Sequence, residues 1–193
     1  MKYHSILLFG APGVGKGTQG KILGAIPHFF HCACGDVFRS LRHDSPLGKV
    51  FIRYSSHGQL VPDEPTVELW RDFIHNTTKI GRYKPEQDFL VLDGIPRNRA
   101  QAEILRDTLD VAAIFYLKCA DEAKLVERVQ RRALKETRLD DASLQVIRDR
   151  LNIYARETEP VLEFYGSRLV HEINADQPPV KVLADILQYV VKL

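Results

Sequence analysis

The 193-residue sequence is poor in cysteine, with three residues, and contains a single tryptophan and a single methionine. An odd, small number of cysteines does not suit a disulfide framework and favours free thiols in a reducing compartment. Cys32, Cys34 and Cys119 are also too few and wrongly spaced for a structural zinc site, so we expect none. The cytoplasm is therefore the expected location.

Long apolar runs are lacking as well, because no stretch approaches the roughly 18 residues that a membrane-spanning helix needs. The short apolar run near the N-terminus leads directly into glycines, which is unlike a signal peptide. The formal net charge is only +2, too small to indicate a nucleic-acid partner. We expect neither a membrane nor a nucleic-acid partner. With 45% hydrophobic and 27% charged residues, the composition is that of one globular domain.

The most informative stretch is Gly10–Thr18, which reads G-A-P-G-V-G-K-G-T. The apolar run 6–9 precedes it and a helix-compatible run follows it, which is the strand–loop–helix context of a phosphate-binding loop. Glycines let backbone N–H groups face inward, and a helix N-terminus favours anions. Lys16 would reach the outer phosphates, and Thr18 offers a hydroxyl toward Mg²⁺. The general pattern has the hydroxyl residue directly after the lysine, whereas Gly17 intervenes here.

Apolar runs and helical periodicity alternate along the rest of the chain. Strands are expected at residues 5–9, 29–32, 89–92, 111–117 and 169–173. Helices are expected at 16–25, 36–43, 46–58, 62–79, 98–109, 121–132, 143–165 and 179–192. The alternation predicts an α/β fold with a parallel sheet covered on both faces and all strand carboxyl ends at one edge. Residues 36–87 show helices but no convincing strand, which predicts a helical insertion.

Two charged residues follow the clearest buried strand. Asp93 ends this strand, and a carboxylate opposite a phosphate loop can hold magnesium through water. Arg97 comes after the stiff turn Gly94-Ile95-Pro96 and can bind a phosphate with two parallel hydrogen bonds. Both residues are therefore expected in the cleft that the phosphate loop forms.

Arginines recur in the second half of the chain. Arg128 and Arg132 lie one helical turn apart, Arg138 lies in the polar segment 135–141, and Arg150 lies early in the next helix. A reaction that transfers a phosphoryl group between two anionic partners needs several cations to hold like charges together. The pattern therefore favours phosphoryl transfer.

No Ser-His-Asp or Cys-His arrangement accompanies these arginines. Transfer to a hydroxyl usually needs a carboxylate to accept the proton, whereas a phosphate acceptor is already anionic. Asp36 is the candidate base if the acceptor is a hydroxyl group. The sequence thus favours a phosphate as the acceptor.

These motifs resemble, over essentially the full length, those of adenylate kinase and related nucleoside-monophosphate kinases. The matching residues are Gly10–Thr18, Gly35-Asp36 with Arg39, the segment 58–63 (G-Q-L-V-P-D), the segment 93–97 (D-G-I-P-R) with Gln101, Arg128 with Arg132, Arg138-x-Asp140-Asp141, and Arg150. The resemblance implies a P-loop NTPase-type parallel five-stranded sheet flanked by helices. It further implies a core of about residues 1–33, 88–131 and 142–193, a monophosphate-binding helical insertion of about 34–87, and a short lid of about 132–141 without zinc.

The resemblance also implies roles for individual residues. ATP would be bound by Gly13, Val14, Gly15, Lys16, Gly17, Thr18, Arg128, Arg132 and the backbone near Pro178. AMP would be bound by Cys34, Arg39, Gln59, Leu60, Val61, Gly94, Ile95, Pro96, Arg97, Gln101, Arg138 and Arg150. The moving phosphoryl group would be stabilised by Lys16, Arg97, Arg128, Arg132, Arg138 and Arg150. Mg²⁺ would accompany ATP near Thr18 and Asp93, held through water.

Two positions depart from the adenylate kinase pattern. Cys34 stands where the family usually has Thr or sometimes Ser, and a thiol is a poor hydrogen-bond partner. Ile95 replaces the usual Phe. Gln101, by contrast, matches the adenylate pattern, and a Gln amide can pair with the donor–acceptor edge of adenine. Because buried polar pairs decide base choice, we give Gln101 more weight and expect the direct reaction ATP + AMP ⇌ 2 ADP.

Three alternatives stay open at this point. A UMP/CMP kinase would have the same fold, a regulatory protein would bind nucleotide without catalysis, and a small-molecule kinase would transfer to a hydroxyl group. We expect the protein to be a monomer.

Overall fold

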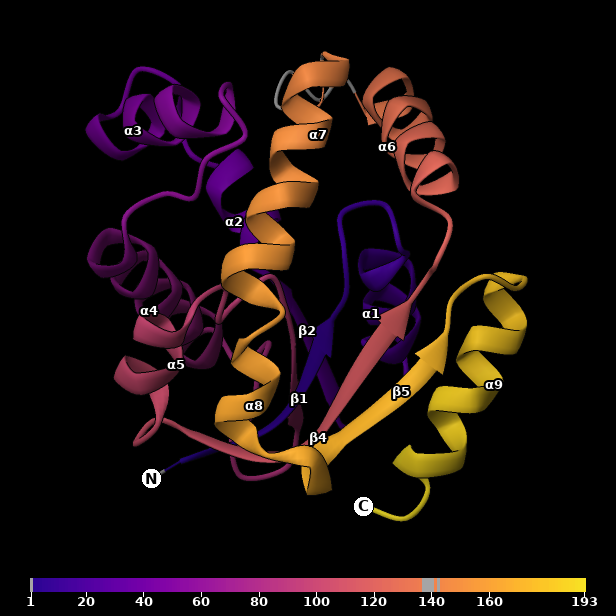
Figure 1. Ribbon diagram of the computed structural model, residues 1–193. Helices are drawn as coiled ribbons and strands as arrows, with labels where there is room; N and C mark the ends of the chain where they lie inside the picture. Colours follow the sequence, from indigo (N-terminus) through magenta and orange to yellow (C-terminus); the bar gives the residue numbers. More distant parts are fainter. Residues whose placement is uncertain (1, 137–140, 142) are drawn as a thin grey trace.

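The computed structural model describes residues 2–136, 141 and 143–193, so the predicted site residue Arg138 lies outside the described residues. Within this part of the chain, five parallel strands form a sheet in the order β2-β3-β1-β4-β5 (Figure 1). The strands are β1 (Tyr3–Phe9), β2 (Phe29–Ala33), β3 (Phe89–Asp93), β4 (Leu109–Lys118) and β5 (Val170–Asn174). The predicted α/β class and the five parallel strands are confirmed.

Strand β1 lies at the centre of the sheet and is buried on both faces. Leu7 and Phe9 contribute to one hydrophobic core, and Ile6 and Leu8 contribute to the other. This division follows from strand geometry, since successive side chains point to opposite faces. A central parallel strand therefore needs apolar residues on both faces, and residues 6–9 of β1 are all apolar and buried.

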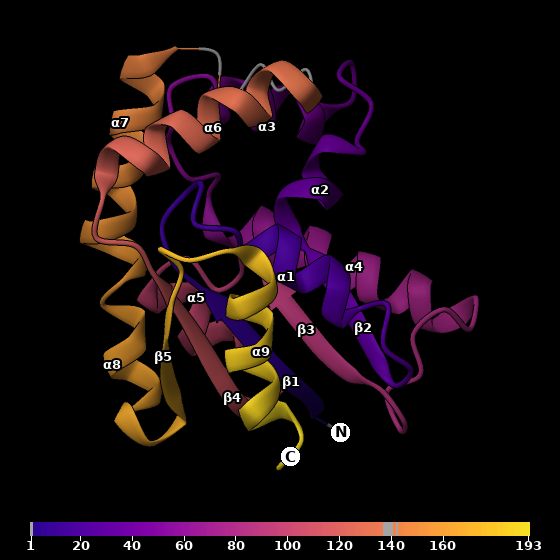
Figure 2. The ribbon, with the colours of Figure 1, turned by 90° about the vertical axis from the view of Figure 1, so that its right-hand side faces the viewer.

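Helices cover both faces of this sheet (Figure 1). The first core is closed by α2 (Cys34–Arg39), α4 (Asp63–Lys79), α5 (Arg99–Leu105) and α8 (Val161–Tyr165). The second is closed by α1 (Lys16–Leu23), α9 (Pro179–Val190) and the inner sides of α6 (Glu122–Glu136) and α7 (Leu144–Ile153). Figure 2 shows α6 and α7 above the carboxyl ends of the strands. No helix in the described part of the chain is long and apolar enough to cross a bilayer.

The register of the sheet brings three functional segments to the same level. Asp93, the last residue of β3, pairs with Leu8 on one side and with Ala33 on the other. The phosphate loop begins two residues after Leu8, and Cys34 directly follows Ala33. The sequence-based expectation that these segments converge at one sheet edge is therefore confirmed.

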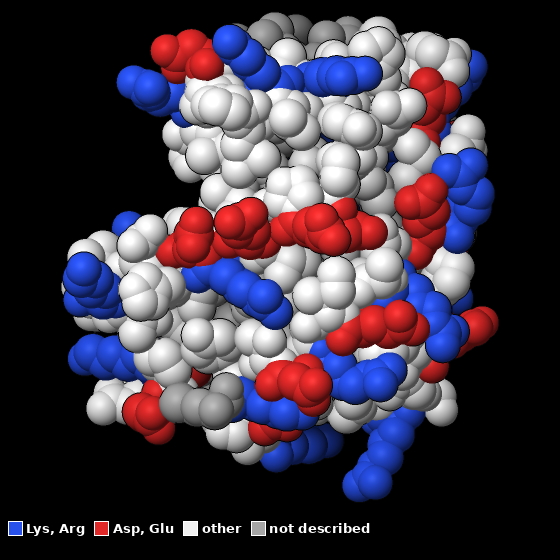
Figure 3. All heavy atoms as spheres, turned by 90° about the vertical axis from the view of Figure 1, so that its left-hand side faces the viewer, with Lys and Arg blue, Asp and Glu red and all other residues white. Residues whose placement is uncertain are grey.

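Residues 34–87, all of which the structure describes, contain α2, α3 (Pro46–Ser55) and α4 and no strand, as predicted. The ring of Phe38 in α2 stacks on that of Phe51 in α3 at 5.2 Å between centroids. Ser45 caps α3, its hydroxyl accepting a hydrogen bond from the N–H of Gly48 at 3.1 Å. The face with α3 and α4 carries a row of acidic side chains and is indented at one side (Figure 3).

Several predicted helices were too long. The helix expected at 36–43 ends at Arg39, and that expected at 46–58 ends at Ser55. The expected helix 143–165 is interrupted, because α7 gives way to a π-helix at Tyr154–Thr158 and α8 follows Pro160. Pro160 has no N–H to continue an α-helix, and the N–H of Glu159 bonds instead to the carbonyl of Tyr154, five residues back, at 2.9 Å. The expected helix 98–109 ends at Leu105, because Leu109 already belongs to β4.

We predict that stability depends on the sheet core far more than on exposed apolar residues. Ile114 in β4 is fully buried, and Ile114→Ala should lower the free energy of unfolding by about 2–5 kcal/mol. Ile80 is 66% exposed, and Ile80→Ala should change the free energy of unfolding by less than about 0.5 kcal/mol. Urea denaturation followed by circular dichroism measures both, and equal effects would contradict this description of the core.

Candidate active site

The carboxyl edge of the sheet borders a cavity of about 1000 Å³. Its walls are the phosphate loop, α2, the loop after β3, α6, α7 and the start of α9. Among the described residues, nine Lys and Arg side chains line it, against three Asp and Glu. An excess of one charge in a concave, partly desolvated site concentrates the electrostatic potential, so the cavity favours anionic ligands.

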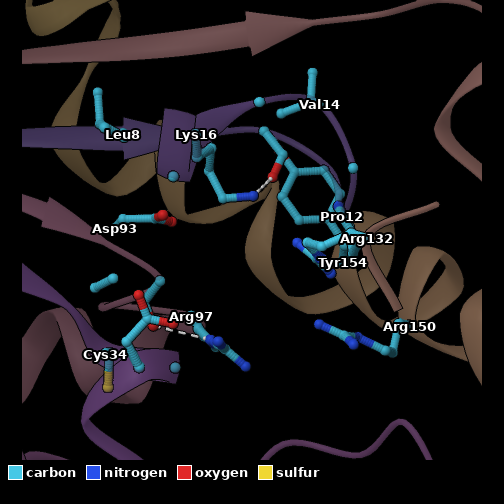
Figure 4. Close-up of a pocket in the computed structure, with 18 of the residues that line it drawn as sticks. Leu8, Pro12, Val14, Lys16, Cys34, Asp93, Arg97, Arg132, Arg150 and Tyr154 are labelled. Atoms are coloured by element: carbon cyan, nitrogen blue, oxygen red, sulfur yellow. Dashed lines mark hydrogen bonds between the residues drawn. The ribbon is translucent and has the colours of Figure 1, made fainter. Parts of the chain in front are cut away.

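The phosphate loop depends on glycines with positive φ angles. Gly10 has a φ of 141° and Gly13 a φ of 84°, values that other residues rarely adopt. A Cβ on Gly13 would also stand 2.6 Å from the carbonyl oxygen of Leu125. Lys16 opens α1, and its Nζ folds back over the loop to donate to the Gly10 carbonyl at 2.6 Å and the Ala11 carbonyl at 3.2 Å (Figure 4).

The positive charge of the cavity acts on Lys16 itself. The pKa of its amine is lowered to about 8, chiefly through desolvation by burial, with smaller contributions from the charges of Arg97, Arg132 and Arg150. Asp93 opposes this effect. A phosphate bound here would favour the protonated amine, because a nearby negative charge stabilises a positive one. An anionic ligand would therefore be stabilised by this cluster of cations.

Asp93 lies beside the first turn of α1. A Cβ on Gly17 would come within 3.5 Å of its Oδ2, which places the carboxylate next to the residue before Thr18. A carboxylate and a hydroxyl are oxygen donors of the kind that Mg²⁺ accepts when it keeps several waters and binds phosphates. The donor set therefore fits a magnesium ion that arrives with a nucleotide. Among the described residues, no group of three His, Cys, Asp or Glu gathers as in a protein-only metal site.

Arg97 is held firmly by its backbone. Its N–H donates to Gln101 Oε1 at 2.8 Å, and its carbonyl accepts from the Thr158 hydroxyl at 2.7 Å. Its Nε donates to the Gly94 carbonyl at 2.9 Å. Figure 4 shows the rest of the guanidinium pointing into the same space as Arg150, close to Cys34. A preorganised guanidinium of this kind can bind a phosphate in a fixed position.

Asp141 joins α6 to α7. Its side chain is fully buried, and Oδ2 accepts from Arg132 at 3.1 Å from Nε and 2.6 Å from NH2. Oδ1 accepts from Arg150 NH1. The carboxylate therefore holds two of the predicted catalytic arginines together at the upper wall of the cavity.

Two further predicted arginines are also fixed by hydrogen bonds. Arg39 in α2 donates to Asp36 Oδ1 at 2.6 Å, and Arg128 in α6 donates to the Ala175 carbonyl at 3.3 Å. Arg131 pairs with Glu127 at 2.7 Å and also lines the cavity. Cations from both halves of the chain thus surround one space.

Most of the predicted site residues line this cavity. They are Gly13, Val14, Gly15, Lys16, Gly17, Thr18, Cys34, Arg39, Gln59, Leu60, Val61, Asp93, Gly94, Pro96, Arg97, Gln101, Arg128, Arg132 and Arg150. Ile95 instead packs in the hydrophobic core with 2% exposure, and Pro178 precedes α9 while its neighbours Gln177 and Pro179 line the cavity.

Sequence reasoning gave no role to several residues that shape the site. Asp141 was visible as part of the matching segment next to Arg138, but its burial was not. Tyr154 and Thr158 line the cavity from the π-helix, which no sequence pattern predicted. Asp63 reaches the site from α4 by accepting a hydrogen bond from Gln101 Nε2 at 2.8 Å.

Comparisons with known proteins agree with this geometry. A family model described as adenylate kinase matches residues 8–170. A protein of Cyanothece sp. named adenylate kinase is 37% identical over 97% of this chain and 95% of its own length. A protein of the same name from Synechococcus sp. is 34% identical over 90% of this chain and 89% of its own length. Another from Micrococcus luteus is 39% identical over 84% of this chain and 78% of its own length. The chain therefore belongs to the adenylate kinase family.

Proposed function

We propose that the protein transfers the γ-phosphoryl group of ATP to AMP, reversibly, to give two molecules of ADP. As a member of its family the chain is a phosphotransferase, and the proposal extends this to the residues of the cavity. The observation that carries it is one positively charged cavity with a phosphate loop on one wall and Arg97 on the opposite wall. Its volume of about 1000 Å³ is at the upper end for single small-ligand pockets, which suits two nucleotides.

ATP is assigned to the side of α1 and α6. The glycine loop presents backbone N–H groups and the N-terminus of α1 to the phosphates, and Lys16 adds a charge at the outer end. Arg128 and Arg132 approach from α6, and Gln177 and Pro179 border the end of the cavity where we place the adenine. When bound with ATP, Mg²⁺ would be held through water by Thr18 and Asp93 and would neutralise charge on the phosphates.

AMP is assigned to the side of α2 and α5. Arg39 and Arg97 are placed to bind its phosphate, while residues 59–61 border the space for its nucleoside. Gln101 lies deeper and is available to the base. In this assignment the segment 34–87 forms the acceptor side and the segment 132–141 the lid.

The chain performs the reaction by positioning and charge stabilisation. The acceptor oxygen is already anionic, so no side chain needs to remove a proton. Lys16, Arg97, Arg132 and Arg150 converge on the space between the two phosphates and would stabilise the charge of an in-line transition state. Closure of α6 and α7 over the cavity would exclude water and so limit ATP hydrolysis.

The observations favour this reaction over the alternatives. Transfer to a hydroxyl would require a free carboxylate base, but Asp36 is paired with Arg39 at 2.6 Å. A UMP/CMP kinase is not favoured by relatives named adenylate kinase. We further propose that the protein is a monomer. We also propose that it works in the cytoplasm, because Cys32, Cys34 and Cys119 are all free thiols, as is usual in a reducing compartment.

The proposed function is tested by ADP formation from Mg-ATP with AMP, CMP, UMP or GMP as separate acceptors. We expect a strong preference for AMP. Equal or better transfer to CMP or UMP would show that Cys34 and Ile95 have changed the acceptor pocket. ATP binding without transfer to any monophosphate would support a non-catalytic role.

Removing either central cation should reduce turnover strongly. We expect Lys16→Ala or Arg97→Ala to lower kcat by at least about 100-fold, because one preorganised donor is worth a few kcal/mol in the transition state. Arg99→Ala is the matched control, since Arg99 is two residues from Arg97 but pairs with exposed Glu103 at 3.0 Å. Wild-type turnover in Lys16→Ala or in Arg97→Ala would contradict the proposed mechanism.

Cys34 lies in the proposed AMP pocket and is 2% exposed. Burial raises the pKa of its thiol to about 11, although the charge of Arg97 partly opposes the effect. Because the thiolate is the reactive form, its fraction at pH 8 is only about one in a thousand. The thiol is therefore expected to tolerate mild alkylating reagents.

We predict that iodoacetamide at pH 8 modifies partly exposed Cys119 much faster than Cys34. The rate at Cys34 should rise with pH up to about 11, as the thiolate forms. Mass spectrometry of tryptic peptides measures both rates, with Cys34→Ser as the control for peptide assignment. Rapid modification of Cys34 at pH 8 with loss of activity would contradict the buried, protonated thiol.

A further inference from the structure

The carboxamide of Gln101 is held at both ends. The side chain is 1% exposed and borders the cavity from α5. Its Oε1 accepts from the Arg97 N–H at 2.8 Å, and its Nε2 donates to Asp63 Oδ1 at 2.8 Å. Asn98 Nδ2 donates to the same oxygen of Asp63 at 2.8 Å. Asp63 belongs to α4, which lies beside α5 (Figure 1).

These partners allow one orientation of the amide. A backbone N–H can only donate and an ionised carboxylate can only accept. Rotating the Gln101 amide by 180° would place its NH₂ against the Arg97 N–H and its oxygen against the Asp63 carboxylate, leaving two buried polar pairs unsatisfied. In the observed orientation, Nε2 keeps one hydrogen and Oε1 one lone pair for a further partner.

The free hydrogen and lone pair define which base fits beside them. A complementary base presents an acceptor nitrogen next to an exocyclic amino group, as the N1/N6 edge of adenine and the N3/N4 edge of cytosine do. The corresponding edge of hypoxanthine, guanine or uracil presents an N–H beside an oxygen, which requires the reversed amide. Amide orientation thus distinguishes amino from oxo bases, and pocket size then distinguishes purine from pyrimidine.

We propose that Asp63 is a positioning residue that sets base specificity, because it fixes the Gln101 amide for a 6-amino purine and against a 6-oxo purine. This inference rests on the proposed function, in which Gln101 contacts the acceptor base. Asp63 is well suited to the task, since it lies in the first turn of α4, where the helix dipole stabilises a negative charge.

The experiment compares AMP with IMP, which differ only in the amino or oxo group at C6 and the proton at N1. We measure kcat/KM for each acceptor with saturating Mg-ATP in the wild-type enzyme and in Asp63→Asn. The wild-type enzyme should prefer AMP by about 10- to 100-fold or more, the value of one bidentate base contact. Asp63→Asn should lower the AMP/IMP ratio by about 10-fold, because the new amide can either accept from or donate to Gln101, and only the Arg97 N–H then favours the observed orientation.

Glu64→Gln is the matched control. Glu64 is the next residue in the same helical turn, is exposed and loses the same charge on substitution. It should leave the AMP/IMP ratio unchanged, and the KM for ATP should not change in either variant. Cooperative unfolding on heating shows whether Asp63→Asn is folded. If it is not, Asp63→Ser is measured in its place with the same expectation, since a hydroxyl also both donates and accepts.

A double-mutant cycle tests whether Asp63 acts through Gln101. In a Gln101→Leu background, Asp63→Asn should have no further effect on the AMP/IMP ratio. If Asp63 had a purely structural role, Asp63→Asn would lower transfer to AMP and to IMP by the same factor. The AMP/IMP ratio would then be unchanged, which would overturn the inference about Asp63 but not the proposed function. A wild-type enzyme that transfers to neither monophosphate would overturn the proposed function as well.

Discussion

The rest of the site depends on a concentration of positive charge inside one partly buried cavity. Arginines and lysines from α1, α2, the loop after β3, α6 and α7 face the same space. Desolvation by burial, together with the charges of nearby arginines, lowers the pKa of Lys16. Carboxylates offset part of the repulsion between these cations: Asp141 between Arg132 and Arg150, and Asp36 beside Arg39. These pairs keep the cations in place, and the phosphates of two nucleotides would supply the remaining negative charge.

The fold makes this concentration possible because it brings distant segments to one sheet edge. The level register of Leu8, Ala33 and Asp93 places the phosphate loop, the start of α2 and the turn before Arg97 side by side. The π-helix at Tyr154–Thr158 then ties α7 to that turn through the hydrogen bond from the Thr158 hydroxyl to the Arg97 carbonyl. Donor and acceptor sides of the cavity are thus connected by rigid elements, with α6 and α7 above them (Figure 2).

Much of this arrangement could be predicted from the sequence, for reasons that differ from residue to residue. The apolar strand, the glycines and Lys16 carry a local signal, and Asp93 and Arg97 follow a strand end whose position parallel topology determines. Thr158 carries no such signal, because its role arises from a contact with a residue 61 positions away. Asp63 lies in the matching segment 58–63, but its contact with Gln101, 38 positions away, could not be read from that motif. The interruption of the long helix was missed because the periodicity of apolar residues continues across Pro160.

The claim that the cavity holds two nucleotides is tested most directly by equilibrium binding of ADP. ADP is the one nucleotide that would occupy both sides, so calorimetric titration of the wild-type chain in the presence of Mg²⁺ counts the sites. The account predicts two ADP molecules per chain, and it predicts that Arg97→Ala weakens one of the two sites selectively. Binding of a single ADP, with Lys16 and Arg97 variants affecting the same site, would contradict it.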